Sequence, residues 1–229
     1  MGTVLLLRHG ETEWSRTGRH TGLTDIGLTP AGEAEARRAA RLLAGRAPVL
    51  VLTSPLQRAR RTAELVGLAA LGPVETDADL VEWDYGKAEG RTGIEILADF
   101  PGWSIWTHGA PGGESPAGIG ARLDRVLSRV RPLVLSPAST PGGPAEGSDR
   151  PDPLVVIVGH GHALRVLTAR WLGLEPAAGA LFRLDTAALS ILGFEHARPV
   201  LRAWNVTARA WTSPREPGTS PRRDGRAAP

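Results

Sequence analysis

The feature that most constrains the fold is a set of three short apolar runs, separated by segments with helical signals. The runs are Thr3 to Leu7, Val49 to Thr53 and Leu154 to Val158. Short unbroken apolar runs are typical of strands that are buried on both faces of a sheet. Because these strands alternate with helices, the sequence predicts an α/β domain with a mostly parallel central sheet.

Predicted helices lie between these runs, and two of them begin at Thr29-Pro30 and Ser54-Pro55. Proline is favoured at the first position of a helix, and the hydroxyl residue before it can cap the helix. In the helix after Ser54, apolar residues recur on one face, so Arg58 is expected at the helix entrance. The predicted helices cover 30–43, about 55–66, 119–131 and about 164–171.

Later apolar segments are expected to complete the sheet: Leu181 to Leu184, Ala188 to Phe194 and Val200 to Trp204. We therefore expect about six strands in a three-layer α/β/α arrangement. Residues 1–211 are expected to form one domain, which a chain of 229 residues with 41% apolar content can support. Stretches dense in Pro, Gly and Ser predict a flexible loop at 136–153 and a disordered basic tail at 212–229.

Composition narrows the chemistry and the partners. The chain has no cysteine, which excludes disulfides, thiolate nucleophiles and cysteine-ligated metals. The pI of 10.4 accompanies a formal charge of only +3, so it overstates the attraction for polyanions and no nucleic-acid partner is expected. The run from Val4 to Leu7 stops at Arg8 and fits neither a leader nor a membrane span. A cytoplasmic location without a membrane partner is therefore expected.

Reactive side chains fall at the carboxyl ends of the predicted strands, where open α/β sheets bind ligands. Arg8 and His9 follow the first run, Arg58 begins the helix after the second, and His160 follows the third. Two imidazoles and two guanidiniums gathered there would repel one another without an anion. A phosphoryl group fits this requirement, because arginine binds its oxygens through paired hydrogen bonds and the helix start after His160 adds N–H donors. A neutral imidazole in such a cage can attack phosphorus in line.

The segment from Leu7 to Trp14, with the sequence LRHGETEW, resembles the signature of the histidine phosphatase superfamily. Other segments occur in the order typical of that family, and together they span Leu5 to about Trp171. They are Thr21 to Asp25 with Leu28-Thr29, Ser54-Pro55 with Arg58-Ala59, Glu82 to Gly86 through Glu89-Gly90, and Gly159 to Gly161. The resemblance implies a phosphoglycerate mutase-like fold.

The resemblance also implies roles for individual residues. His9 is similar to the nucleophile that becomes phosphorylated, and Arg8, Arg58 and His160 are similar to the rest of the phosphate pocket. Glu82 matches the family's proton donor, which protonates the departing alkoxide and then draws a proton from the attacking water. The expected activity is hydrolysis of the phosphomonoesters of small metabolites, with no cofactor.

Departures from the mutase pattern favour the phosphatases of this family. Ser15 stands where the mutases usually have asparagine, and their adjacent arginine pair is not evident. The motifs are most similar to those of actinobacterial acid phosphatases and sedoheptulose-bisphosphatase-like enzymes, in which the equivalent of Arg165 helps to hold a second phosphate. The expected substrate-binding residues are Ser15, Thr21, Gly22, Tyr85, Gly161 and Arg165.

Two other functions stay open at this point, as does a homodimer. A cofactor-dependent phosphoglycerate mutase would return the phosphoryl group to another hydroxyl of the substrate, and a noncatalytic module would only bind phosphate. His160 and His162 have no third metal ligand nearby in the sequence, so no metal is expected and His162 is predicted to be structural. No role is assigned to His20, His108 or His196.

Overall fold

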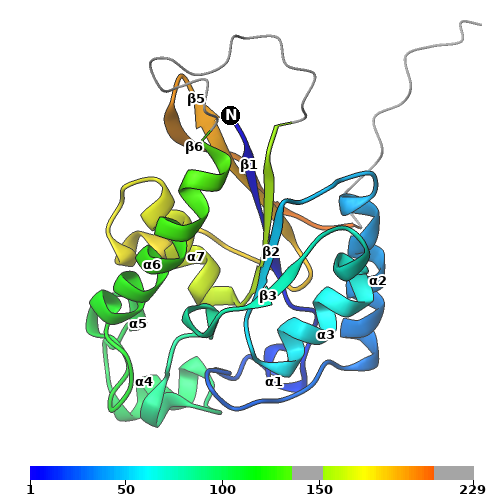
Figure 1. Cartoon of the computed structure of the whole chain (residues 1–229). Coiled ribbons are helices and arrows are strands. Elements are labelled where there is room, and N and C mark those ends of the chain that lie inside the picture. Colours follow the sequence, from blue (N-terminus) through cyan, green and yellow to red (C-terminus); the bar gives the residue numbers. More distant parts are fainter. Residues whose placement is uncertain (136–151, 209–229) are drawn as a thin grey trace, which may run out of the picture.

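The computed structural model describes residues 1–135 and 152–208, which are drawn in colour in Figure 1. The tail expected at 212–229 and most of the loop expected at 136–153 lie outside the described residues. The division into one domain and a tail therefore stays a prediction. Within the described part of the chain, no helix combines the length and the apolar character that a membrane crossing requires.

The centre of the molecule is a six-stranded sheet with the order β3-β2-β4-β1-β5-β6. Strands β1 to β4 run parallel, whereas β5 and β6 are antiparallel to their neighbours. This confirms the predicted α/β class and the mostly parallel sheet. The strands are β1 (Thr3–Arg8), β2 (Leu50–Thr53), β3 (Val74–Thr76), β4 (Leu154–Gly159), β5 (Leu189–Glu195) and β6 (Arg198–Val206).

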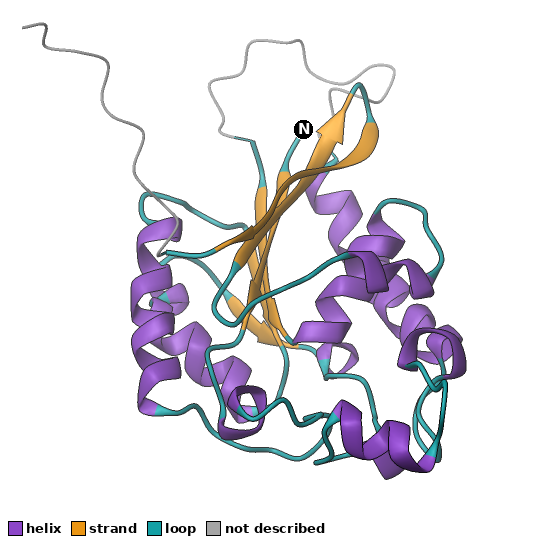
Figure 2. Ribbon diagram, turned by 180° about the vertical axis from the view of Figure 1, so that it is seen from behind, coloured by secondary structure: helices purple, strands orange, loops and turns teal. Residues whose placement is uncertain are grey.

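Helices cover both faces of the sheet, which confirms the three layers (Figure 2). In Figure 1, α2 and α3 lie on one side of the sheet and α5, α6 and α7 on the other, while α1 and α4 lie beyond the carboxyl ends of the parallel strands. The helices are α1 (Glu13–Arg16), α2 (Pro30–Leu43), α3 (Gln57–Val66), α4 (Gly93–Asp99), α5 (Ile105–His108), α6 (Pro116–Val134) and α7 (Gly161–Trp171).

The alternation of side chains along β1 explains why both faces need a helical layer. Val4 and Leu6 pack into the core that β1 shares with α6 and α7. Leu5 and Leu7 pack into a second core with α2 and α3. All four side chains are fully buried. Because successive strand residues point to opposite faces, an unbroken apolar run is stable only between two layers.

Two details of the sheet differ from the prediction. The strand expected at Leu181 to Leu184 was wrong, because Leu181 instead ends a 3₁₀ helix, Pro176–Leu181, and is 79% exposed. The carbonyl of Leu184 accepts a hydrogen bond from Arg8 rather than from a neighbouring strand. The sixth strand is β3, which sequence analysis missed because its three residues are all exposed and pair only with β2.

Helix α3 begins at Gln57, two residues after the expected proline, and its N-cap residue Leu56 makes no side-chain capping bond. The hydroxyl of Ser54 accepts a hydrogen bond from the Leu56 N–H, so the Ser-Pro pair forms a turn before the helix. Arg58 is therefore the second residue of α3, as near to its entrance as predicted.

Candidate active site

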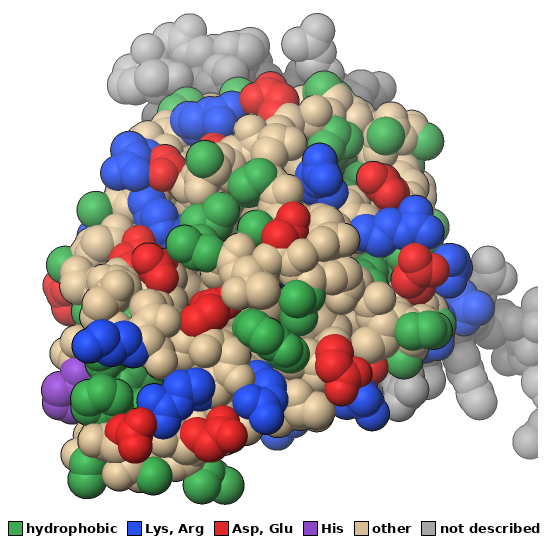
Figure 3. Space-filling model, turned by 90° about the horizontal axis from the view of Figure 1, so that it is seen from below, with side chains coloured by type: hydrophobic (Ala, Val, Ile, Leu, Met, Phe, Trp, Pro, Cys, Tyr) green, Lys and Arg blue, Asp and Glu red, His purple; other side chains and the backbone are tan. Residues whose placement is uncertain are grey.

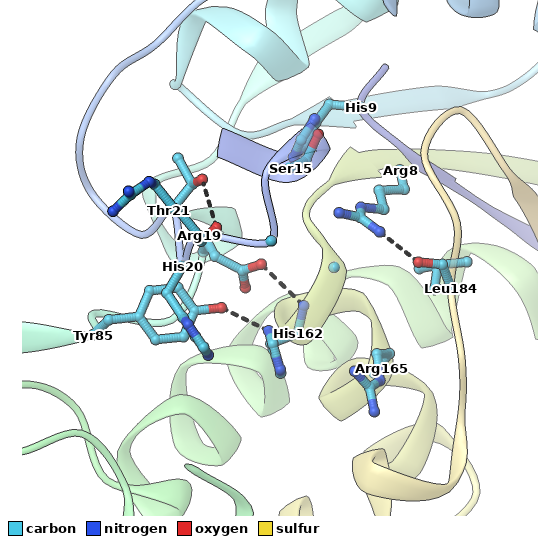
Figure 4. A pocket seen from close by; sticks show the side chains of 13 residues that line it. Arg8, His9, Ser15, Arg19, His20, Thr21, Tyr85, His162, Arg165 and Leu184 are labelled. Carbon is cyan, nitrogen blue, oxygen red and sulfur yellow. Dashed lines mark hydrogen bonds between the residues drawn. The ribbon is translucent and has the colours of Figure 1, made fainter. Parts of the chain in front are cut away.

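A pocket opens at the carboxyl ends of β1 and β4, with a cavity volume of about 220 Å³. Figure 3 views this end of the molecule, where basic and acidic side chains lie among exposed apolar ones. Figure 4 shows the interior of the pocket. Its wall is formed by Arg8, His9, Ser15, Gly18, Arg19, His20, Thr21, Glu82, Tyr85, Gly161, His162, Arg165 and Leu184. Segments that are far apart in the sequence therefore meet where sequence analysis expected a site.

The imidazole of His9 lies at the end of β1 and is held as a nucleophile requires. Its Nδ1 is 2.7 Å from the carbonyl of Gly10, so Nδ1 carries the proton and donates it, which leaves a lone pair on Nε2. Burial, followed by the positive charges of Arg58 and Arg8, holds the pKa of His9 well below its ordinary value of 6.5. The imidazole is therefore neutral at physiological pH.

Two glycines allow α2 to pack directly against the backbone that carries His9. A Cβ at Gly10 would lie 2.3 Å from the carbonyl oxygen of Gly32, and a Cβ at Gly32 would lie 2.1 Å from that of Glu11. The N–H of Gly10 also donates to the hydroxyl of Thr62 in α3, at 3.1 Å. This close approach fixes the direction in which the chain leaves β1, and with it the position of the imidazole.

The guanidinium of Arg8 is only partly satisfied by the protein. One Nη donates to the carbonyl of Leu184, whereas the buried Nε has no hydrogen-bond partner in the described residues. Burial lowers the pKa of Arg8 from its ordinary value. A Cβ on residue 161 would come within 3.3 Å of the guanidinium carbon, so Gly161 leaves the space that the group occupies. An unpaired buried N–H is costly and would be satisfied by an anion in the pocket.

Arg58 and His160 lie behind the pocket and do not line it. The Nε of Arg58 donates to Nδ1 of His160 at 3.1 Å, and Nε2 of His160 lies 2.7 Å from the hydroxyl of Ser54. The ring centroids of His160 and His9 are 5.2 Å apart. The structure thus brings together the two guanidiniums and two imidazoles that the sequence predicted, with Arg58 and His160 behind the pocket.

Arg58 also fixes the loop that forms the opposite wall. Its guanidinium donates to the carbonyls of Thr21, Gly22 and Thr24, at 3.2, 2.7 and 2.9 Å. Burial lowers its pKa, and the same burial together with the charge of Arg58 holds the pKa of His160 well below the ordinary value. His160 is therefore a neutral imidazole as well.

The carboxyl group of Glu82 lines the pocket and is bound to the beginning of α7. It accepts hydrogen bonds from the backbone N–H groups of Trp83, His162 and Ala163, at 2.9, 2.9 and 2.8 Å. The sequence analysis assigned the N–H donors of this helix start to the phosphate. In the structure two of them instead hold Glu82, because a carboxylate is also stabilised at a helix N-terminus.

The residues expected to bind substrate fall into two groups. Ser15, Thr21, Tyr85, Gly161 and Arg165 line the pocket, whereas Gly22 does not. The N–H of Gly22 donates to the carboxylate of Glu89, and a Cβ at this position would lie 2.5 Å from the carbonyl oxygen of Trp83. Close packing therefore explains why position 22 is a glycine.

The guanidinium of Arg165 stacks on Trp106 at 4.3 Å and donates to the carbonyls of Gly179 and Ala180.

Sequence analysis missed the pocket residues His20, His162 and Arg19. His162 had a detectable signal, because it precedes Arg165 by three residues and such residues share one helix face. His20 had none, since it reaches the pocket only when its loop folds against Tyr85, with ring centroids 4.8 Å apart. His108 and His196 do not line the pocket.

Residues 1–135 and 152–208 contain no cluster of three His, Asp or Glu side chains that could hold a metal.

Comparison with known proteins identifies the family. The model of the histidine phosphatase superfamily (branch 1) matches residues 4–207. This chain belongs to the histidine phosphatase superfamily. It is 40% identical over 196 residues to an acid phosphatase of Mycobacterium tuberculosis, and the aligned region covers 84% of this chain and 87% of that protein. It is 36% identical over 193 residues to sedoheptulose 1,7-bisphosphatase of Saccharomyces cerevisiae, and the aligned region covers 74% of this chain and 67% of that protein.

Solved structures of other histidine phosphatases share the fold. A mycobacterial glucosyl-3-phosphoglycerate phosphatase in complex with VO3 superimposes with a TM-score of 0.76 and 31% identity, covering 90% of this chain and all (100%) of that chain. The resemblance to the superfamily and to its phosphatases, which the sequence motifs indicated, is therefore confirmed. The roles of individual residues stay predictions.

Proposed function

We propose that this histidine phosphatase hydrolyses phosphomonoesters of small metabolites through a phosphohistidine on His9. The observation that supports this proposal is the neutral, buried imidazole of His9, whose Nδ1–H is bound to Gly10 so that the Nε2 lone pair is available. Arg8 lines the same pocket, and its Nε–H, which has no partner among the described residues, suits a phosphate oxygen. By their names, the relatives described above are phosphatases, and two of them act on sedoheptulose 1,7-bisphosphate and glucosyl-3-phosphoglycerate.

In the first step, Nε2 of His9 attacks phosphorus in line with the ester oxygen. The N–P bond forms while the P–O bond of the ester breaks, and the departing alkoxide takes a proton from the carboxylic acid of Glu82. Arg8 neutralises the charge on the phosphoryl oxygens. The positive charge of Arg58, which lies behind the pocket, adds to this stabilisation. Catalysis of this kind depends on position and electrostatics, both of which the buried site supplies.

In the second step, water attacks the phosphohistidine and the carboxylate of Glu82 accepts its proton. The N–P bond breaks, inorganic phosphate leaves, and His9 returns to its neutral form with Glu82 protonated for the next cycle. One residue thus serves as acid and then as base. The three backbone N–H groups that hold Glu82 keep its carboxyl group in the pocket during both steps.

The test is rapid chemical quench with an ester that carries a labelled phosphoryl group. We expect an acid-labile label on wild-type protein, no label on His9→Gln, and loss of phosphate release in that variant. His108→Gln is the matched control, because His108 is exposed and does not line the pocket. Continued turnover by His9→Gln, or turnover by the wild type without a labelled intermediate, would reject the mechanism.

The same assay separates the two alternative functions. A mutase given 3-phosphoglycerate and a bisphosphate primer would isomerise it rapidly with little free phosphate, and a binding module would give neither product nor label. We expect phosphate release as the dominant outcome.

Because charged esters do not cross bilayers unaided, we also propose a cytoplasmic location, which cell fractionation tests. A homodimer stays a prediction for light scattering.

A further inference from the structure

The imidazole of His162 lies in the pocket, and the proposed chemistry does not use it. It lines the same cavity as His9 and Glu82, and Figure 4 shows it between Tyr85 and Arg165. Its Nδ1 lies 2.6 Å from the Tyr85 hydroxyl. The ring is also packed against Trp106, with centroids 4.9 Å apart. These contacts fix the orientation of the imidazole.

The hydrogen bond to Tyr85 determines which nitrogen of His162 carries the proton. Burial, followed by the charge of Glu82, raises the pKa of Tyr85 well above its ordinary value, so the hydroxyl keeps its hydrogen. In the described residues Nδ1 of His162 is the only side-chain or backbone atom bonded to this hydroxyl, so we infer that the hydroxyl donates its hydrogen to Nδ1. Burial, followed by the charge of Arg165, holds the pKa of His162 well below its ordinary value. The neutral ring then carries its single hydrogen on Nε2.

The Nε2 atom of His162 is available to a ligand. This atom makes no hydrogen bond in the described residues. It is also absent from the fully buried atoms that lack a partner there, so it is not completely closed off. The backbone N–H of the same residue donates to Glu82, the group assigned to the leaving oxygen. His162 is therefore joined to the part of the pocket that handles the leaving group rather than to the phosphate-binding part around Arg8.

We propose that the Nε2–H of His162 recognises substrate by donating a hydrogen bond to an oxygen atom of the leaving group, and that Tyr85 is the positioning residue that fixes this donor. The proposal rests on the proposed phosphatase function and adds a substrate class. Leaving groups rich in hydroxyl or carboxylate oxygens, such as those of sugar phosphates, are favoured over apolar ones. A site built to hydrogen-bond a substrate oxygen discriminates strongly against an analogue that lacks it.

The test compares two esters in matched variants. One ester is the sugar phosphate that the wild type hydrolyses fastest in a panel of hexose and pentose phosphates, and the other is phenyl phosphate, whose leaving group has no second oxygen. His162→Phe keeps a ring and the backbone N–H to Glu82 but removes the donor. We expect this variant to lower the ratio of the two kcat/KM values, sugar phosphate over phenyl phosphate, about 10-fold or more.

Two further variants separate recognition from packing. His162→Gln keeps an N–H donor and should recover part of the lost ratio. Tyr85→Phe should lower the ratio in the same direction, and the double variant with His162→Phe should lose less than the product of the two single effects, because the residues act as a unit. His108→Phe, outside the pocket, is the control and should leave the ratio unchanged.

Three outcomes would overturn the role of His162. They are an equal loss for both esters in His162→Phe, no loss for either, and a wild-type enzyme that prefers phenyl phosphate to every sugar phosphate. The first would show that the ring acts only by packing around Glu82. None of them affects the proposed function, which fails separately if the wild type releases no phosphate from any ester or forms no phosphohistidine.

Discussion

The carboxyl group of Glu82 accepts a hydrogen bond from the backbone N–H of Ala163 at 2.8 Å, so the proposed proton donor is attached to the amino end of α7. The same helix contributes His162 and Arg165 to the pocket wall. Glu82 itself comes from the loop after β3, 81 positions earlier in the chain. The proposed proton donor and these two pocket residues are thereby fixed to one rigid element.

Glu82→Gln should separate the two chemical steps. With 4-nitrophenyl phosphate, whose leaving group departs without a proton, we expect stopped-flow absorbance to show a burst of about one nitrophenolate per site. A slow phase should follow, because glutamine cannot take a proton from water. Sugar phosphates should lose about 100-fold or more in kcat without a burst. Glu64→Gln on the exposed face of α3 is the control. If Glu82→Gln turned over at the wild-type rate without a burst, the role proposed for Glu82 would be contradicted.

Arg8→Lys should weaken phosphate binding while keeping the positive charge. The guanidinium offers a buried Nε–H that no group in the described part of the chain satisfies, and an ammonium group cannot reproduce that paired geometry. We expect the inhibition constant of inorganic phosphate to rise about 10-fold. Arg183→Lys, whose side chain is 87% exposed, is the matched control. An unchanged inhibition constant in Arg8→Lys would mean that the phosphate lies elsewhere.

The buried imidazoles predict loss of stability in mild acid. The folded-state pKa values of His9, His160 and His162 all lie well below 6.5, so below pH 6.5 the unfolded chain binds protons that the folded chain does not. The free energy of unfolding should therefore be highest above about pH 6.5 and fall as the pH drops below it. Each group adds up to about 1.4 kcal/mol per pH unit to this fall.

Urea denaturation of wild type and His162→Phe at pH 7.5 and 5.5 measures that contribution. The variant lacks one of the three imidazoles, so its loss of unfolding free energy between the two pH values should be smaller than that of the wild type. His108→Phe, at an exposed position, should behave as the wild type does. Equal losses in wild type and His162→Phe would show that the buried ring does not carry the expected linkage.

Gly10→Ala should destabilise the fold and displace the nucleophile together. Its new Cβ would collide with the carbonyl oxygen of Gly32 at 2.3 Å, and neither backbone can yield without moving β1 or α2. We expect a loss of about 1 to 3 kcal/mol in unfolding free energy and a large loss of kcat. Gly93→Ala, where no atom lies within 4 Å, should be neutral or slightly stabilising. Similar results for both variants would contradict the packing argument.

The sequence predicted those parts of the fold that depend on local pattern. Unbroken apolar runs identified β1, β2 and β4, and the family motifs led to Arg8, His9 and Glu82. β3 was missed because its exposed residues carry no apolar signal. The strand expected at Leu181 to Leu184 was wrong because three apolar residues in a short segment do not reveal whether a neighbouring strand is present.

The limits of sequence reasoning at the site have a common cause. Gly22 was expected to touch substrate, yet it contacts Glu89 and Arg58, because only the folded loop decides which side of a backbone faces the cavity. His162 was expected to be structural, and the role proposed for its Nε2 depends on the bond to Tyr85, which the sequence does not reveal. Which residue faces a ligand depends on contacts between segments 60 to 80 positions apart in the chain.

The chain of hydrogen bonds from Arg58 through His160 to Ser54 is closed off from water, since all three residues are fully buried. The imidazole hydrogen shared with Ser54 should therefore exchange slowly enough to give a sharp proton resonance far downfield in an NMR spectrum. His160 lies behind the pocket with its ring centroid 5.2 Å from that of His9, so its resonance frequency should shift when His9 becomes phosphorylated. The fold thereby supplies a built-in spectroscopic reporter of the intermediate, with no label added to the substrate.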